Sequence, residues 1–322
     1  MSIGIVVIGR NEGERLTACL RSIANQDHPI VYVDSGSTDG SAANARSFGA
    51  EVVELDMSIP FTAARARNAG FERLISSHPD IGFVQFVDGD CVVDDEWLGT
   101  ARDFLTHRRD VAVAAGRRRE MYPDASLYNW LCDIEWNTPV GEAEACGGDA
   151  LMRVEAFRAV GGYRDDLIAG EEPELCLRLR ESGWLIWRLD CEMTRHDANI
   201  QHFGQWWRRT RRGGYAFGSV SWLHRTSAYG IWGKEVRRAT VWAGVIPAVI
   251  VALTSVSAYG LFGLATYPLQ ITRMAVKRGP ERPRNWQYAM FMALAKFAEF
   301  QGIAEFFLVR LAGRERSIIE YK

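Results

Sequence analysis

The chain has 322 residues, of which 48% are hydrophobic and 24% are charged, so it must fold and can bury one large core or two smaller ones. Its formal net charge of −2 gives no support to a nucleic-acid partner, although basic residues concentrate after about residue 205. The six cysteines show neither a C-x-x-C pair nor His/Cys ligand spacing, which indicates no disulfide framework and no zinc site and fits a reducing compartment.

The N-terminal third alternates short β-branched runs with helical stretches. The expected strands are 3–8, 30–33, 51–54, 83–87 and 111–115, and the expected helices between them are 14–26, 41–49 and 61–77. This order predicts an α/β fold with a mainly parallel sheet flanked by helices. The chain opens on an apolar strand-like segment that is too short for a secretory signal, so we expect this domain to stay in the cytoplasm.

Polar segments follow the first two expected strands. VIGRNEGERL carries Asn11 and Glu12, and VDSGSTDG carries Asp34, Ser35 and Asp39. In an open α/β sheet the ligand crevice lies at the carboxyl ends of the strands. Small residues let the backbone approach a ligand there, and Asp34 and Asp39 can accept hydrogen bonds from a base or ribose. Taken alone, each segment is more typical of a polar turn that caps a helix.

Two acidic pairs stand later in the chain. FVDGDC places Asp88 and Asp90 just past an apolar strand, where two carboxylates can converge on Mg²⁺ or Mn²⁺ and so neutralise a departing diphosphate. Glu171 and Glu172 precede an expected helix over 173–181. They can simply cap that helix; alternatively, adjacent acids repel each other, which keeps one of them basic enough to take a proton.

An uncharged stretch of 34 residues, 239–272, lies in the last third. It is too long for one upright membrane span, and Gly260 offers a break, so we expect helices over 239–257 and 261–276 that form a hairpin, 239–276. Basic residues flank both outer ends, which keeps both ends cytoplasmic. The alternative is a buried helical pair of a soluble protein.

The segment 286–311 is apolar but interrupted by four charged residues, which predicts an interfacial amphipathic helix instead of a further span. We therefore expect a catalytic domain over 1–230 and a helical, membrane-associated region over 231–322. Four arginines stand beside two tryptophans near the expected boundary: Arg208, Arg209, Arg211 and Arg212. They can bind the pyrophosphate of a lipid-linked acceptor, or lie among anionic lipid headgroups with the tryptophans at the interface.

Several motifs occur together in a fixed order. After the N-E of the first strand come VDSGSTDG, A-R-N-x-G at 66–70, D-G-D, G-G-Y and G-E-E-x-E-L-x-L-R-L-x-x-x-G. This order resembles the family 2 glycosyltransferases of the GT-A fold, in their membrane-associated bacterial type, over roughly 3–187. The combination in register is specific, whereas no single motif is.

The resemblance implies roles for particular residues. Asp39 and the VDSGST loop would bind the nucleotide, with Arg67 nearby, and Asp88 would lie by the ribose. Asp90 would bind the metal, and His196 stands where some members supply a further metal ligand, although a lone histidine is often structural.

The same resemblance makes Glu172 the base that deprotonates the acceptor, with Glu171 as its supporting neighbour. The chain departs from the family at several positions. Ser35 replaces a common second Asp, which weakens the case for UDP; the base is Glu instead of Asp; and QWWRR ends in Arg209 where processive synthases have Trp. We expect single transfers, without polymerisation.

Together these observations predict a metal-dependent, inverting glycosyltransferase that moves a sugar from a UDP- or GDP-sugar to an acceptor hydroxyl. The favoured acceptor is a lipid-linked saccharide or glycolipid of envelope polysaccharide biosynthesis, met at the cytoplasmic face of the plasma (inner) membrane. A sugar-phosphate nucleotidyltransferase is one alternative, but the first loop lacks the expected G-x-G-x-R pattern. An inactive membrane scaffold is another, against which the retained acidic residues argue.

Overall fold

A computed structural model describes residues 1–24 and 26–313. The chain divides into two compact units, Met1–Gln201 and His202–Lys322. The first unit is an α/β domain and the second is helical, so the expected fold class is confirmed. The boundary falls at Gln201, earlier than the expected residue 230, because the helix that follows packs within the second unit.

The first unit is built on one mixed sheet. Its strands, among the described residues, are β1 (Ser2–Gly9), β2 (Ile30–Asp34), β3 (Glu51–Glu54), β4 (Ile81–Asp88), β5 (Cys91–Val93), β6 (Val111–Glu120), β7 (Gly141–Ala143), β8 (Ala150–Arg153) and β9 (Leu185–His196). The order is β3-β2-β1-β4-β8-β6-β9-β5, with β7 paired to β9. Strands β3, β2, β1 and β4 are parallel, but β8 runs antiparallel to both β4 and β6. The sheet is therefore less parallel than the sequence predicts.

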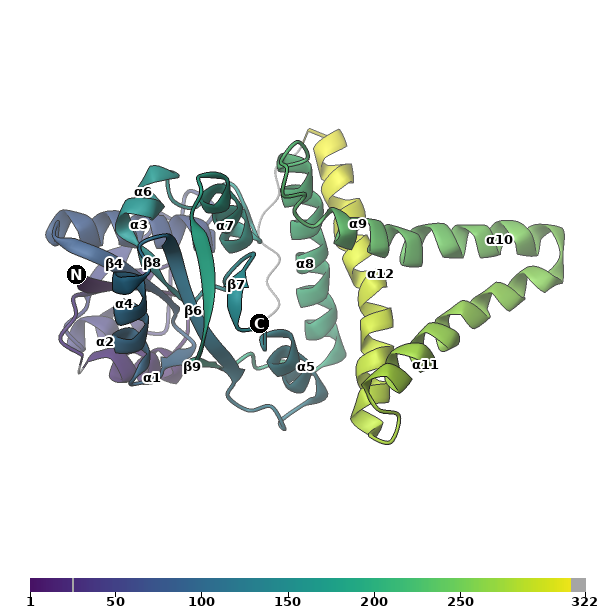
Figure 1. Ribbon diagram of the computed structural model, residues 1–322, viewed down its shortest axis with the longest axis horizontal. Helices are drawn as coiled ribbons and strands as arrows, with labels where there is room; N and C mark the ends of the chain where they lie inside the picture. The colour runs from purple at the N-terminus through teal and green to yellow at the C-terminus, as the bar shows by residue number, and fades with distance from the viewer. Residues whose placement is uncertain (25, 314–322) are drawn as a thin grey trace. The chain divides into compact units, whose positions relative to one another are not determined.

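Helices cover both faces of this sheet (Figure 1). They are α1 (Glu14–Ala24), α2 (Ser41–Ser47), α3 (Ala63–Ser77), α4 (Trp97–His107), α5 (Leu127–Glu135), α6 (Val154–Ala159) and α7 (Glu171–Glu181). The expected helices agree with α1, α2, α3 and α7, except that residue 25 of the first lies outside the described residues. Helix α7 begins at Glu171, two residues earlier than expected, so both glutamates lie in its first turn.

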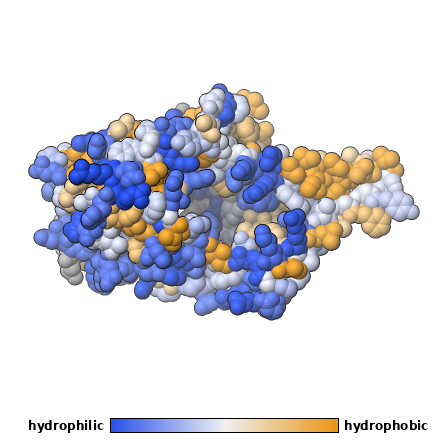
Figure 2. Space-filling view, in the orientation of Figure 1, coloured by the Kyte–Doolittle hydropathy of each residue, from blue (hydrophilic) through white to orange (hydrophobic). Residues whose placement is uncertain are grey.

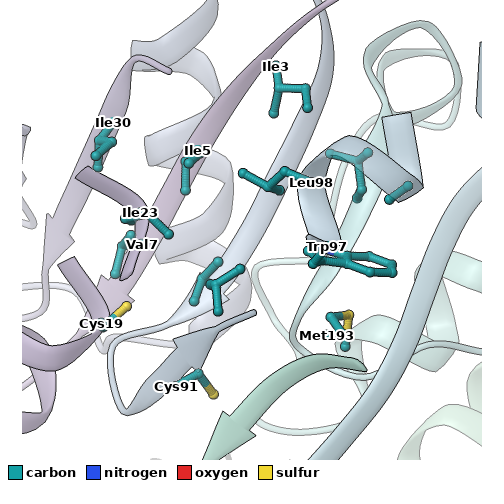
Figure 3. Close-up of a cluster of buried hydrophobic side chains, with 14 of the residues drawn as sticks. Ile3, Ile5, Val7, Cys19, Ile23, Ile30, Cys91, Trp97, Leu98 and Met193 are labelled. Carbon is teal, nitrogen blue, oxygen red and sulfur yellow. The ribbon is translucent and has the colours of Figure 1, made fainter. Parts of the chain in front are cut away.

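Two apolar cores lie on opposite faces of the sheet because successive side chains of a strand point to opposite sides. Ile3, Ile5 and Val7 of β1 pack with α1 and α4 in one core, as Figure 3 shows. Val6 and Ile8 of the same strand pack in the other core, with α3 and α6. A backbone fixed from both faces gives rigid support to the residues at the strand ends.

One edge of the sheet collects the ends of several strands. Strands β1, β2 and β4 end there in parallel, at Gly9, Asp34 and Asp88. Strand β8 is antiparallel to β4 and begins at the edge where β4 ends. Asp149, which directly precedes β8, therefore lies beside the end of β4. The pairing of β5 with β9 places Cys91 opposite His196. Residues far apart in sequence therefore meet at this edge.

The second unit consists of helices. They are α8 (Phe203–Leu223), α9 (Gly233–Thr240), a π-helical turn (Val241–Val245), α10 (Ile246–Val256), a 3₁₀ segment (Ala258–Ala265), α11 (Thr266–Arg278) and α12 (Pro283–Leu311). Helices α8 and α12 lie side by side and touch through glycines. A Cβ at Gly214 would overlap the backbone of Glu299, and one at Gly302 would overlap the backbone of Arg211. This close packing is the reason that α8 belongs to the second unit.

Helices α10 and α11 form an apolar hairpin that projects from α8 and α12 (Figure 1). Two helices follow each other where the sequence predicts them, and their membrane insertion stays a prediction. The chain turns at Ser257, which is extended (φ −153°), and Gly260 packs against the backbone of Thr254. Much of the hairpin's exposed surface is hydrophobic (Figure 2). Among the described residues, one continuous helix, Gly233–Val256, is long and apolar enough to cross a membrane by length and composition.

Candidate active site

Asp88 lies at the centre of an ion-pair network at the carboxyl edge of the sheet. Arg67 of α3 donates from Nη2 to its Oδ1 at 2.8 Å, and Arg118 of β6 donates from Nη2 to its Oδ2 at 3.2 Å. The backbone N–H of Asp88 donates to Oδ1 of Asp149 at 3.0 Å. Burial would raise the pKa of Asp88, but the two guanidinium groups outweigh it and hold that pKa well below its usual range.

Arg67 joins Asp88 to the acidic pair of α7. Its Nη1 lies 2.9 Å from Glu171 Oε1 and 3.2 Å from Glu172 Oε1. Glu171 is buried, whereas the side chain of Glu172 keeps 17% of its surface exposed. Burial and the charge of Glu171 raise the pKa of Glu172 to about 7, although Arg67 acts in the opposite direction. Glu172 is thus a solvent-reachable carboxylate that can accept a proton near neutral pH.

Asp90 and His196 form a second polar pair. The register of β5 and β9 brings His196 Nε2 to 3.0 Å from Asp90 Oδ2, and both side chains are buried. Trp136 stacks on the imidazole, with centroids 4.8 Å apart. Burial and the nearby Arg118 lower the pKa of His196 to about 4, so the ring is neutral at neutral pH. A neutral imidazole beside a carboxylate offers one nitrogen and one oxygen ligand to a cation.

These donors fit a divalent cation. Asp90, Cys91 and His196 each offer a ligand atom within 4.8 Å of the other two. Burial and the charge of Asp149 raise the pKa of the Cys91 thiol, so it stays protonated and is a poor ligand. The oxygen and nitrogen that remain suit Mn²⁺ or Mg²⁺. Both oxygens of Asp88 already contact arginines, so its place among the metal ligands stays a prediction.

The two loops after β1 and β2 are tied together. Asn11 donates from its backbone N–H to Ser37 Oγ at 2.9 Å, and its side-chain oxygen accepts from the N–H of Thr38 at 2.8 Å. Asp39 accepts from the N–H of Gly13 at 3.0 Å and from Ser41. These bonds hold the VDSGST loop against the end of β1.

Asp34 and its neighbours are organised from inside the loop. The carboxylate of Asp34 is buried and accepts from the N–H groups of Gly36 and Ser37 and from the hydroxyl of Tyr32. Ser35 is buried and donates its N–H to the carbonyl of Gly9. Asp34 therefore shapes the loop from inside. Glu12, in the facing loop, is paired with Arg15 at 2.8 Å.

The arginine cluster of the sequence analysis lies in the second unit, on α8. Arg211 Nε is 3.6 Å from Glu305 Oε2 of α12. Arg208, Arg209 and Arg212 stand on the same helix, and their proposed role stays a prediction.

Sequence reasoning missed Arg118, Asp149 and Trp136. Arg118 follows the apolar part of β6, in G-R-R-R-E, where the expected strand stops at Ala115 because the apolar pattern ends. Asp149 follows two glycines, and a Cβ at Gly148 would lie 2.5 Å from Arg67 Nη2 and 2.7 Å from Asp88 Oδ2. In the sequence, the two glycines directly before Asp149 were the feature that could have predicted a close approach of the backbone to polar side chains.

The sequence was compared with known proteins. Residues 4–161 match the model of the family described as glycosyl transferase family 2. The glycosyltransferase AglE of Haloferax volcanii is 23% identical over 197 residues, which cover 57% of this chain and 63% of that protein. The succinoglycan biosynthesis protein ExoA of Rhizobium meliloti is 28% identical over 198 residues, covering 58% and 60%. The matched part is thus under two thirds of the length of either curated relative.

The fold was compared with solved structures. A mannosyltransferase from Pyrobaculum calidifontis, in complex with GDP-mannose and Mn²⁺, has a TM-score of 0.64 at 16% identity, covering 94% of this chain and 86% of that one. The S. aureus protein TarS, in a structure of residues 1–349, has a TM-score of 0.50 at 15% identity, covering 98% and 92%. At these identities the likeness establishes the fold alone.

Proposed function

Residues 4–161 belong to glycosyl transferase family 2, and from this premise we propose that the protein transfers a sugar from a nucleotide-sugar donor to an acceptor hydroxyl with inversion at the anomeric carbon. The observation that carries the proposal is the link through Arg67: one guanidinium contacts both Asp88, at the end of β4, and Glu172, a partly exposed carboxylate in the first turn of α7. A carboxylate of the proposed nucleotide site, Asp88, and the proposed proton acceptor, Glu172, thus both contact the guanidinium of Arg67.

The nucleotide would bind over the loops that follow β1 and β2. Asn11 and Asp39 hold these loops together, and the loop after β2 is exposed at Thr38 and Asp39. Asp88 would lie by the ribose, with Arg67 behind it. We favour a UDP- or GDP-sugar as the donor, because both match the family resemblance and the departure at Ser35 leaves the choice of base open.

Asp90 and His196 would hold Mg²⁺ or Mn²⁺, with Asp88 as a further candidate ligand. When bound there, the cation would supply the charge that neutralises the departing diphosphate. The buried position of the pair excludes bulk water, and the low pKa of His196 keeps its nitrogen unprotonated for ligation.

Glu172 would remove the proton from the acceptor hydroxyl while the oxygen attacks the anomeric carbon. The new C–O bond forms as the bond from that carbon to the diphosphate oxygen breaks, and the nucleoside diphosphate leaves with the electron pair. A single displacement of this kind inverts the configuration. Glu171, fixed on Arg67, keeps a negative charge beside Glu172 and so sustains its basicity.

The acceptor would be a lipid-linked saccharide or glycolipid, met at the cytoplasmic face of the plasma membrane. The support is the apolar hairpin of α10 and α11, with Arg237, Arg238, Lys277 and Arg278 at its two ends. The hairpin would enter one leaflet, and α12 would lie along the surface. Arg208, Arg209, Arg211 and Arg212 of α8 would bind the acceptor's phosphate or anionic headgroups.

Membrane insertion can be tested by labelling single cysteines placed at Ser257 and Gly279 in the full-length protein. We expect the Gly279 site to react from the cytoplasmic face, while the Ser257 site is protected by lipid. Reaction of the Gly279 site only from the outer face would exclude the hairpin. A full-length protein that stays soluble without detergent would exclude insertion altogether.

The transfer reaction can be tested by screening UDP- and GDP-sugars for thermal stabilisation and for metal-dependent release of nucleoside diphosphate. A true donor must stabilise the fold by mass action. We expect both signals from the same nucleotide sugar, and we expect Asp90→Asn to remove them. Stabilisation by a nucleoside triphosphate with a sugar phosphate, accompanied by release of pyrophosphate, would instead indicate a nucleotidyltransferase.

A further inference from the structure

Three consecutive arginines lie near the end of β6, and each has a different environment. Arg117 donates from Nη2 to Asp133 Oδ1 at 2.8 Å. Arg119 is half-exposed and donates from Nε and Nη2 to Glu192 at 2.7 Å. Arg118 contacts Asp88 and Asp149 at the edge of the candidate active site. Of these three arginines, Arg118 is the one that contacts Asp88.

The guanidinium of Arg118 is fixed on several sides. Nη2 donates to Asp88 at 3.2 Å and lies 3.7 Å from Cys91 Sγ, while Nε is 3.4 Å from Asp149 Oδ2. Asp149 is fully buried and also accepts from the Thr194 hydroxyl at 2.8 Å, so it cannot follow the arginine outward. The ring of Trp136 lies 5.0 Å from the guanidinium carbon. The guanidinium of Arg118 is therefore held in place without a bound ligand.

Among the described residues, two donor groups of Arg118 make no hydrogen bond, Nε and Nη1; Nε is buried beside Asp149, whereas Nη1 is not among the buried donors without a partner. Within the part of the chain that the structure describes, Nη1 donates no hydrogen bond, and the side chain keeps 14% of its surface exposed. Nη1 faces Gly147, where an added Cβ would lie only 3.3 Å away. By contrast, Arg67 uses both Nη groups on carboxylates and is 2% exposed. Of the two arginines on Asp88, only Arg118 presents an N–H to open space.

The guanidinium of Arg118 lies next to the candidate metal ligands through its Nη2. Cys91, which Arg118 contacts, is within 4.8 Å of the ligand atoms of both Asp90 and His196. Three carboxylates lie at the same edge of the sheet, those of Asp88, Asp90 and Asp149, and their negative charges repel phosphate. A phosphate group can bind here only where fixed cations offset that repulsion, and a guanidinium suits phosphate oxygens by its planar array of donors.

We propose that Arg118 binds the diphosphate of the nucleotide donor through Nη1, as a fixed cation beside the Asp90–His196 pair. The inference rests on the proposed function, since it takes a nucleoside diphosphate as the leaving group. Because Asp88 and Asp149 hold the guanidinium, it contributes binding even without a divalent cation. Gly147 leaves the space through which the phosphate approaches.

The test is to measure binding of UDP, GDP, uridine and guanosine to the full-length protein by calorimetry, once with Mn²⁺ and once with excess chelator. We expect Arg118→Met to weaken binding of the preferred diphosphate roughly 10- to 100-fold, the range of one charge-assisted hydrogen bond. The affinity for the matching nucleoside should stay the same, because it has no phosphate. Arg119→Met, on the same strand, is the matched control and should bind like the wild type.

Arg118→Met removes one ion-pair partner from both Asp88 and Asp149, so this variant can fail to fold. A second variant, which keeps Arg118, tests the proposal if it does. Gly147→Asp keeps both ion pairs and places a carboxylate in front of Nη1, at a backbone conformation open to any residue. It should cause a similar selective loss of diphosphate binding. Equal weakening of nucleoside and diphosphate, or unchanged diphosphate binding in the folded variants, overturns the role of Arg118. Failure of both diphosphates to bind the wild type overturns the proposed function itself.

Discussion

Replacing Glu172 by Gln gives the most direct test of the proposed mechanism. The amide keeps the size and the contact with Arg67 but cannot accept a proton. Burial and the neighbouring Glu171 raise the pKa of Glu172 to about 7, close to the best value for a base that works at neutral pH. Its loss should lower turnover by roughly 10²–10⁴-fold. This corresponds to about 2.7–5.4 kcal/mol of transition-state stabilisation.

The same substitution should leave the fold and the donor site intact. It relieves repulsion between two adjacent carboxylates, and Arg67 keeps its contacts with Glu171 and Asp88. We therefore expect the free energy of unfolding to change by less than about 1 kcal/mol and donor affinity to stay near the wild-type value.

The assay is release of nucleoside diphosphate from the donor found in the screen, together with the anomeric configuration of the product by NMR. Glu171→Gln is the comparison variant: it removes the charge that raises the pKa of Glu172 but leaves the proton acceptor in place, so we expect a smaller loss of turnover. Normal turnover in Glu172→Gln with a large loss in Glu171→Gln would transfer the role to Glu171. A product with retained configuration would refute direct displacement.

Three further predictions concern pH, metal and packing. Turnover should rise with pH through about 7 as Glu172 loses its proton, and Glu172→Gln should lose this rise. Because the pKa of Glu172 is raised in the folded state, its contribution to stability is present below the ordinary Glu pKa and is lost as the pH rises through about 7. Unfolding measured as a function of pH checks this second effect. Asp90→Asn should abolish Mn²⁺ binding, measured by electron paramagnetic resonance, and transfer with it, without lowering the melting temperature; full activity in this variant, or in wild type with excess chelator, contradicts the metal assignment. Gly302→Leu should destabilise the protein by about 1–3 kcal/mol or more because α8 and α12 meet there, while Gly213→Leu, with open space around it, should cost far less in the same thermal melt.

Local sequence patterns determined much of the first unit. The continuous apolar run of β1 follows from two cores on opposite faces, and the acids at Asp34 and Asp88 mark strand ends because charged side chains are rare inside a buried strand. The uncharged run likewise predicted the hairpin of α10 and α11. Each of these features depends on contacts within a short segment, which the spacing of apolar and charged residues reports.

Only the tertiary structure decided which polar groups meet. His196 reaches Asp90 across 106 positions of sequence because β5 pairs antiparallel with β9, and Arg118 of β6 reaches Asp88, at the end of β4, across 30 positions. The expected strand over 111–115 stopped short of the arginines, because consecutive charged residues in a sequence are typical of a solvent-exposed loop. In the fold the charge of Arg118 is compensated by Asp88 and Asp149, carboxylates from other parts of the sheet's edge, and this pairing of distant charges is a property that no local pattern contains.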